Sequence, residues 1–125
     1  MMMKDFDPVE HLTIFHNAIN ALDYATIESY FAEDAVYVSG GVGGRIDGRD
    51  AIMAAFRKYF DAYPDQVARD KSVDKISDSA ARSVWELAAT DSRTGALMTR
   101  TGEETLVFND QGKITRIDVT DYGTI

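Results

Sequence analysis

The sequence predicts an α+β domain in which N-terminal helices pack in the concave face of a strongly curved antiparallel or mixed sheet. The first observation behind this prediction is length, because 125 residues leave room for one domain only. The second is a change of period, because apolar residues recur at helical spacing before Pro64 and alternate with polar ones after it. The third is a composition of 45% hydrophobic and 27% charged residues, which is ordinary for a globular protein. We therefore expect a single domain over residues 1–125, with residues 1–6 as a disordered tail.

The first two helices are predicted from capping residues and apolar stripes. Asp7 can accept hydrogen bonds from the free amides of a helix start, and Pro8 fits the first helical position. Apolar residues then recur at three- and four-residue spacing up to Leu22. Asp23 caps a second, shorter helix that we expect to run through Phe31.

The remaining elements follow from turn residues and from the change of period. A short strand over residues 35–39 leads into a glycine-rich loop over residues 40–44, which we interpret as a flap over a cavity mouth. A third helix begins at Gly48 and stops at Pro64. Turn-forming connectors then separate four strands, at residues 66–76, 80–90, 96–108 and 113–120.

Charge and composition exclude several kinds of partner. The 13 basic and 21 acidic residues give a formal charge of −8, so the surface repels the phosphates of nucleic acids and anionic lipids. The absence of cysteine excludes disulfides, thiolate metal sites and a cysteine nucleophile. No run of residues has the length and hydrophobicity of a membrane span or of a signal-peptide core. We expect a cytoplasmic protein that binds neither nucleic acid nor membranes.

Five short strings occur in a distinctive order along the chain. They are Ala21–Asp23, Tyr30–Ala35, Ile46–Ile52, Gly102–Glu104 and Gly112–Ile117. In order and spacing they resemble the nuclear transport factor 2-like superfamily, in its SnoaL-like and ketosteroid-isomerase-like branch, over residues 9–122. The resemblance implies the cone-shaped α+β barrel of that superfamily, a platform for unrelated activities whose members commonly dimerise.

The ketosteroid isomerase mechanism does not transfer to this sequence. That enzyme uses a tyrosine, a general-base aspartate and a protonated aspartate. The matching positions hold Phe15, Ser39 and Glu104, so only the last retains an acid. Phenylalanine cannot donate a hydrogen bond to an enolate, and serine near neutral pH cannot abstract an α-proton without a base of its own.

Glu104 is the first catalytic candidate. Alternation along the strand 96–108 places it on the core side of the sheet. A carboxyl group in an apolar cavity can exchange protons near neutral pH. The alternative is a solvent-exposed strand residue, and a register slip of one residue would turn Glu103 inward in its place.

Asp121 is the second catalytic candidate. The predicted hairpin register pairs Phe108 with Lys113, Glu104 with Ile117, and Arg100 with Asp121. Arg100 beside Asp121 would orient the substrate or stabilise charge, and the alternative is a structural ion pair at the cavity mouth.

Aromatic and small polar residues are the candidate ligand-binding residues. Tyr37 and Ser39 share one face of the first strand, and Trp85 lies in the middle of a later strand. A tyrosine hydroxyl or a tryptophan N–H gives an apolar pocket a directional contact, although such aromatics also serve as core residues alone. The complete predicted set is Phe15, Tyr37, Ser39, Phe56, Trp85, Arg100 and Phe108.

The two histidines of the first helix do not form a metal pair. His11 and His16 are five residues apart, so they diverge by about 140° around the helix axis. An inward His16 is typical of a hydrogen-bonded core residue, and it is a reserve candidate for a base because imidazole titrates near neutral pH. We expect no metal site and no cofactor.

Together these features predict a cofactor-free acid–base isomerase, cyclase or hydrolase that acts on a small hydrophobic molecule. The alternative is a non-catalytic ligand-binding or dimerisation module of the same fold. The enzyme predicts at least one inward, unpaired carboxylate, whereas the module predicts that both acids are ion-paired or face water. An isologous homodimer is expected through the outer sheet face, which carries Thr99, Thr101, Thr105 and Val107.

Overall fold

The computed structural model describes residues 6–40 and 43–124, which form three helices and one six-stranded mixed sheet. The helices are α1 (Pro8–Asn20), α2 (Tyr24–Tyr30) and α3 (Arg49–Ala62). The strands are β1 (Phe31–Ser39), β2 (Gly44–Asp47), β3 (Val67–Ser77), β4 (Ala80–Thr90), β5 (Leu97–Phe108) and β6 (Ile114–Thr124). Within those residue ranges, every helix is too short or too polar to cross a bilayer.

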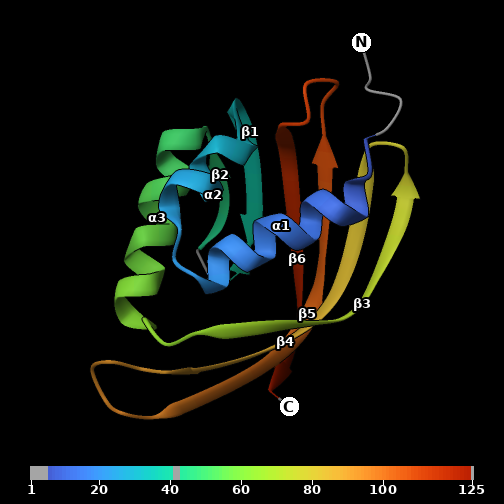
Figure 1. Cartoon of the computed structure of the whole chain (residues 1–125). Coiled ribbons are helices and arrows are strands. Elements are labelled where there is room, and N and C mark those ends of the chain that lie inside the picture. The colour runs from blue at the N-terminus through green and yellow to red at the C-terminus, as the bar shows by residue number, and fades with distance from the viewer. Residues whose placement is uncertain (1–5, 41–42, 125) are drawn as a thin grey trace.

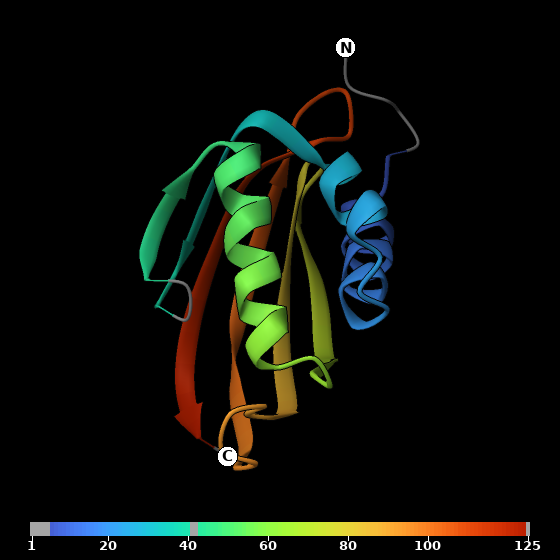
Figure 2. The ribbon, with the colours of Figure 1, turned by 90° about the vertical axis from the view of Figure 1, so that its left-hand side faces the viewer.

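The sheet curls around the helices without closing into a barrel (Figure 1). Its strand order is β2-β1-β6-β5-β4-β3, with β1 and β6 parallel and the other neighbouring pairs antiparallel. All three helices lie on the concave side, with α3 crossing one half of the sheet and α1 the other (Figure 2). The α+β class and the helix-filled concave sheet predicted from the sequence are confirmed.

The predicted helix starts are confirmed by their capping bonds. The Asp7 side chain accepts from the Val9 amide, and Pro8 occupies the first helical position of α1. Asp23 caps α2 by accepting from the Thr26 amide and hydroxyl. The inward faces then pack into one core, whose fully buried members include Leu12, Phe15, Ile27, Phe31, Ile52, Leu106, Ile114 and Ile117.

The second helix ends earlier than predicted, and the first strand begins earlier. Phe31 has extended backbone angles, with φ −81° and ψ 133°, and it pairs with Ile114 of β6. Its side chain is 1% exposed and contacts the rings of Phe15 and Phe56 edge to face. Tertiary packing of this one ring therefore draws into the sheet a residue that the local pattern assigned to a helix.

The loop predicted over residues 40–44 ends one residue earlier than expected, because Gly44 is already part of a strand. Gly44–Asp47 form the edge strand β2, which pairs antiparallel with β1. The strand escaped prediction because it has four residues, two of them charged, as is common at sheet edges. Arg45 and Asp47 form an ion pair along it, at 2.9 Å. Residues 41 and 42 of the predicted flap lie outside the described residues, as do residues 1–5 of the predicted tail, whereas Phe6 packs in the core.

The β5–β6 register differs from the predicted one. Phe108 pairs with Ile114 rather than Lys113, and an irregularity between Val107 and Phe108 shifts the ladder further. Glu104 consequently lies opposite Val119 and Arg100 opposite Thr124. For Glu104 the displacement is two residues, which preserves the face to which its side chain points, so it is still directed inward.

Candidate functional site

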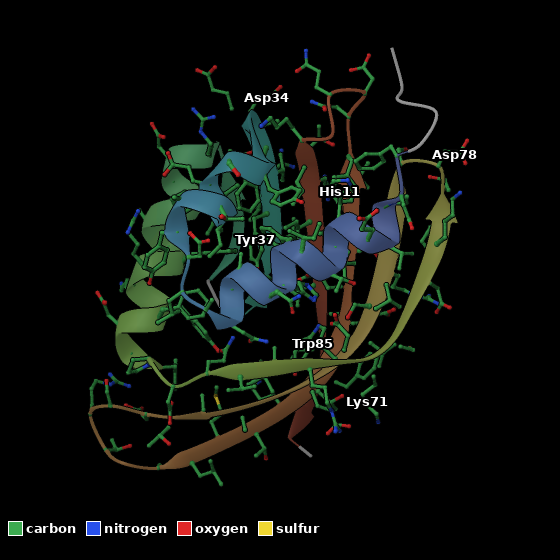
Figure 3. All side chains as sticks on the ribbon, viewed as in Figure 1. His11, Asp34, Tyr37, Lys71, Asp78 and Trp85 are labelled. Carbon is green, nitrogen blue, oxygen red and sulfur yellow. The ribbon has the colours of Figure 1, made fainter. Side chains whose placement is uncertain are left out.

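A cavity of about 130 Å³ lies between the helices and the concave face of the sheet. Its wall combines residues of α1, β1, α3, β3, β4, β5 and β6 with Gln66, which directly precedes β3. The lining residues are His16, Ile19, Tyr37, Ser39, Phe56, Tyr59, Phe60, Gln66, Ala68, Trp85, Leu87, Arg100, Glu104, Val119 and Asp121. Figure 3 shows two of them, Tyr37 between α1 and α3, and Trp85 on β4 beside the crossing strand β3.

An ion pair between α1 and β5 occupies the inner part of the cavity wall. His16 Nε2 donates to Glu104 Oε1 over 2.5 Å, and both side chains are nearly buried, at 13% and 11% exposure. Helical spacing turns His16 to the sheet, and strand alternation turns Glu104 to the helix. Among the hydrogen bonds between described residues, none reaches Glu104 Oε2. One carboxylate oxygen is thus fixed by an imidazole while the other is available to a molecule in the cavity.

The other ring nitrogen of the imidazole is bound by a second carboxylate. His16 Nδ1 donates to Asp70 Oδ1 over 2.8 Å, and the fully buried Ser83 hydroxyl donates to the same oxygen over 2.6 Å. Asp70 comes from β3 and Ser83 from β4. The four side chains form a continuous hydrogen-bonded chain in the order Ser83, Asp70, His16 and Glu104.

Electrostatics keep this histidine protonated. Burial lowers the pKa of His16, but the charge of Glu104 and the hydrogen bonds to Asp70 and Glu104 outweigh it, and the pKa rises from 6.5 to about 10. Burial raises the pKa of Asp70, but its hydrogen bond to His16 and the imidazolium charge lower it below its ordinary value overall. Near neutral pH the arrangement is therefore an imidazolium between two carboxylates.

Arg100 and Asp121 form a second ion pair in the cavity wall. Their side chains are 37% and 27% exposed, so they mark the end of the cavity that opens to solvent. Asp121 pairs with Gly102, so the contact with Arg100 is diagonal across β5 and β6 rather than directly opposite as the predicted register had it. The side chains nevertheless meet because both lie on the concave face.

Tyrosine hydroxyls supply neutral donors to the cavity. Burial, reinforced by the charge of Glu104, raises the pKa of Tyr37 well above its ordinary value. Burial and the neighbouring Tyr63 raise the pKa of Tyr59 to about 12. Both phenols stay protonated across the physiological range and can donate hydrogen bonds to a ligand.

The structure places the predicted site residues in two groups. Those lining the cavity are Tyr37, Ser39, Phe56, Trp85, Arg100, Glu104 and Asp121. Phe15 and Phe108 do not line it, because Phe15 is fully buried in the core and Phe108 packs against Phe6 and His11. The structure therefore places these two phenylalanines in the apolar core.

Of the four members of the hydrogen-bonded chain, only Glu104 is a leading candidate from the sequence; Asp70 and Ser83 are absent from the predicted set. His16 had been a reserve candidate, and its helix position alone indicated an inward side chain. Asp70 is the middle one of three consecutive charged residues in β3, and nothing in the sequence distinguishes it from its neighbours. Only the curvature of the sheet, which brings β3 under α1, shows the relationship (Figure 1).

Across residues 6–40 and 43–124, no three His, Asp or Glu side chains converge in a way that could hold a metal ion. The triad of Asp70, His16 and Glu104 illustrates why. Both imidazole nitrogens face carboxylate oxygens, so neither has a lone pair directed to an ion.

Solved structures of low sequence identity share this fold. An NTF2-like protein of unknown function from Exiguobacterium sp. is 18% identical, with a TM-score of 0.78 over 89% of this chain and 97% of its own. RV0760c from Mycobacterium tuberculosis, solved with estradiol-17beta-hemisuccinate, is 17% identical, with a TM-score of 0.80 over 94% of each chain. The epoxide hydrolase/cyclase-like enzyme SalBIII, which takes part in pyran ring formation in salinomycin, is 16% identical, with a TM-score of 0.79 over 93% and 94%.

Sequence comparison adds the family. No functionally curated protein matches the chain. The model of the SnoaL-like domain matches residues 12–117, a span that begins within α1, ends within β6 and includes His16, Asp70 and Glu104. The chain therefore belongs to the SnoaL-like domain family, within the NTF2-like fold.

Proposed function

We propose that the protein is a cofactor-free proton-transfer enzyme, an isomerase or cyclase that acts on a small cyclic ketone. The observation that carries the proposal is the carboxylate of Glu104 in the cavity wall, with Oε1 held by His16 and Oε2 open to a bound molecule. The relationship to SalBIII, a cyclase-like enzyme, and to a protein solved with a steroid ester supports a small organic substrate.

In the proposed step, Glu104 Oε2 takes a proton from the carbon next to the substrate carbonyl. The C–H electron pair forms the enolate, whose oxygen accepts a hydrogen bond from the Tyr37 hydroxyl. Glu104 then returns the proton to another carbon of the conjugated system, so the substrate is isomerised without being oxidised or reduced. His16 does not exchange this proton. Its hydrogen bond to Asp70 fixes the imidazolium, whose positive charge holds the carboxylate of Glu104 in place.

The test follows the conversion of the unconjugated isomer of cyclohexenone into the conjugated ketone by ultraviolet absorbance. We expect the wild-type protein to accelerate it, and Glu104→Gln to lower the rate by roughly 10²- to 10⁴-fold. The matched control is Glu103→Gln, because Glu103 lies on the outer face beside Arg82. Equal rates for wild type and Glu104→Gln, or no acceleration over buffer, would contradict the proposal.

A second candidate function is a binding module without catalysis. It is favoured by one observation, that both acids in the cavity wall are ion-paired, Glu104 with His16 and Asp121 with Arg100. The same assay separates the two functions, because a module binds small molecules but leaves the isomerisation rate at the buffer value.

Homodimerisation and a cytoplasmic location also remain proposals. The outer face around Thr99, Thr101, Thr105 and Val107 is half-buried in the single chain. Ion pairs flank this surface, among them Arg82 with Glu103, so a second copy would have to match both charge and shape. A concentration-independent monomer in size-exclusion chromatography would contradict the dimer.

A further inference from the structure

The volume of the cavity limits what it encloses. At about 130 Å³ it is close to the roughly 150 Å³ apolar cavity that binds benzene in another protein, and well below the roughly 300 Å³ at which sites for larger ligands begin. It therefore encloses one six-membered ring, and any further ring has to protrude through the open end.

Interlocked aromatic rings form much of the wall. The ring of Phe56 contacts those of Tyr37 and Phe60 edge to face, at 5.1 and 6.1 Å between centroids. Tyr59 contacts Phe60 in the same manner, at 5.4 Å. Because each ring abuts the next, none can turn aside without displacing a neighbour.

Trp85 closes the opposite side of the cavity and is itself pressed against the sheet. It is 8% exposed and lies opposite Gly102 of β5. A Cβ atom at position 102 would lie 2.6 Å from Trp85 Cζ2, so the indole occupies the space that a side chain there would need. The indole cannot retreat toward β5, and its size therefore sets the width of the cavity.

The polar groups of the wall indicate a neutral ligand with a hydroxyl group. Both cations in the wall are already ion-paired, Arg100 with Asp121 and His16 with two carboxylates, so neither is left to neutralise an anion. Gln66 lines the cavity, and its buried Oε1 has no hydrogen-bond partner among the described residues. A buried acceptor of this kind is satisfied when a bound molecule donates to it.

We infer that the cavity binds neutral single-ring compounds that carry a hydroxyl group, with Trp85 as the residue that limits ring number and Gln66 as the residue that binds the hydroxyl. The inference rests on the proposed function, because it names the substrate class of the same site. It distinguishes this chain from its structural neighbour RV0760c, which was solved with a four-ring steroid ester.

The test measures the affinities of phenol, 2-naphthol and benzoate by isothermal titration calorimetry. For the wild-type protein we expect phenol to bind at least about tenfold more tightly than 2-naphthol, because of size, and than benzoate, because of charge. Trp85 is the only tryptophan, so a change in its fluorescence on adding phenol places the ligand in the cavity. Absence of phenol binding, or equal affinity for 2-naphthol, would overturn the inference.

Variants assign the roles of the two residues. We expect Trp85→Leu and the milder Trp85→Phe to raise the affinity for 2-naphthol relative to phenol by about tenfold or more, whereas Val84→Ala, on the other face of β4, leaves the ratio unchanged. We expect Gln66→Leu to weaken phenol binding by about fivefold and to leave toluene binding unchanged. If both Trp85 variants are shown by circular dichroism to be folded and their affinity for 2-naphthol relative to phenol is unchanged, Trp85 does not limit the number of rings.

The two proposals fail separately. If 2-naphthol binds as tightly as phenol while isomerisation still depends on Glu104, the size limit is wrong and the proposed function stands. If the phenol preference and its dependence on Trp85 hold while cyclohexenone is not isomerised, the substrate class stands and proton transfer is wrong.

Discussion

Asp70 and Glu104 lie on strands that β4 separates, and the imidazole of His16 bridges their carboxylates. The bridge spans the concave face of the curled sheet and anchors α1 to it. A protonated histidine donates to both carboxylates at once, whereas a neutral imidazole has one N–H and can donate to only one of them. Stability and the geometry of the cavity therefore both depend on the charge of a single side chain.

This dependence predicts a loss of stability at alkaline pH. The pKa of His16 is raised from 6.5 to about 10 on folding, so its stabilising contribution is complete below pH 6.5 and is lost as the pH rises through about 10. We expect the free energy of unfolding, measured by urea denaturation, to fall across this window by an amount on the order of a few kcal/mol. His16→Gln cannot titrate and is expected to lack that slope. Parallel curves for the two proteins would contradict the prediction.

On the acid side of the stability curve, the free energy of unfolding is expected to fall as the pH decreases. The pKa of Asp70 is lowered on folding, so its contribution is present above its ordinary value of 3.8 and is lost as the pH falls through the folded-state pKa. Asp70→Asn is expected to flatten the acid limb of the same stability curve and to lower the pKa of His16, which NMR titration of the ring protons measures. A His16 titration that Asp70→Asn leaves unmoved would contradict the proposed bridge.

Ser83 is expected to act through Asp70. Ser83→Ala removes the 2.6 Å hydrogen bond to Asp70 Oδ1 and leaves a buried carboxylate oxygen with one donor fewer. We expect a stability loss of about 1–3 kcal/mol and a lower His16 pKa, because a less firmly held carboxylate stabilises the imidazolium less. Ser72→Ala, at an exposed position of β3, is the control. A loss of stability without movement of the His16 titration would show that Ser83 supports packing only.

The elements that the sequence predicted well are those whose signals are local. Asp7 and Asp23 cap helices because the relevant amides lie two or three residues away, and alternation alone directs Glu104 inward. The short edge strand β2 and the early start of β1 at Phe31 depend instead on pairing with distant strands, so no local pattern contains them.

The candidate site also combines residues that the sequence predicts locally with contacts that depend on distant parts of the chain. Tyr37 and Trp85 were predicted to line a cavity from residue type and strand position, and both do. The link between His16 and Asp70 joins residues 54 positions apart in the chain, and it exists only because the curled sheet carries β3 beneath α1. The pairing of Phe108 with Ile114 and the irregularity between Val107 and Phe108 together set the partner of Glu104, and an irregularity of that kind has no marker in this sequence.

Gly102 is expected to be intolerant of a side chain. A Cβ atom there would collide with the Thr120 carbonyl oxygen and lie 2.6 Å from Trp85 Cζ2. Because one of these contacts is backbone, we expect Gly102→Ala to cost about 1–3 kcal/mol of stability and to shift the tryptophan emission as the indole is displaced. Gly40→Ala, where a Cβ atom meets nothing within 4 Å, is expected to be neutral. An unshifted emission in Gly102→Ala would contradict the close packing of Trp85.

The Arg100–Asp121 pair is expected to be worth more than an ion pair on the open surface. Its side chains are 37% and 27% exposed, against 60% and 65% for Arg45 and Asp47, so solvent screens it less. A double-mutant cycle with Arg100→Gln and Asp121→Asn is expected to give a coupling energy of about 1 kcal/mol, while the same cycle on Arg45 and Asp47 gives a few tenths at most. Chemical denaturation at low and high salt measures both, and the coupling at the cavity is expected to persist in salt that abolishes the surface one. Equal coupling energies with equal salt dependence would mean that the mouth of the cavity is as well solvated as the outer surface, and the pair could then neither orient a substrate nor help to exclude water from Glu104.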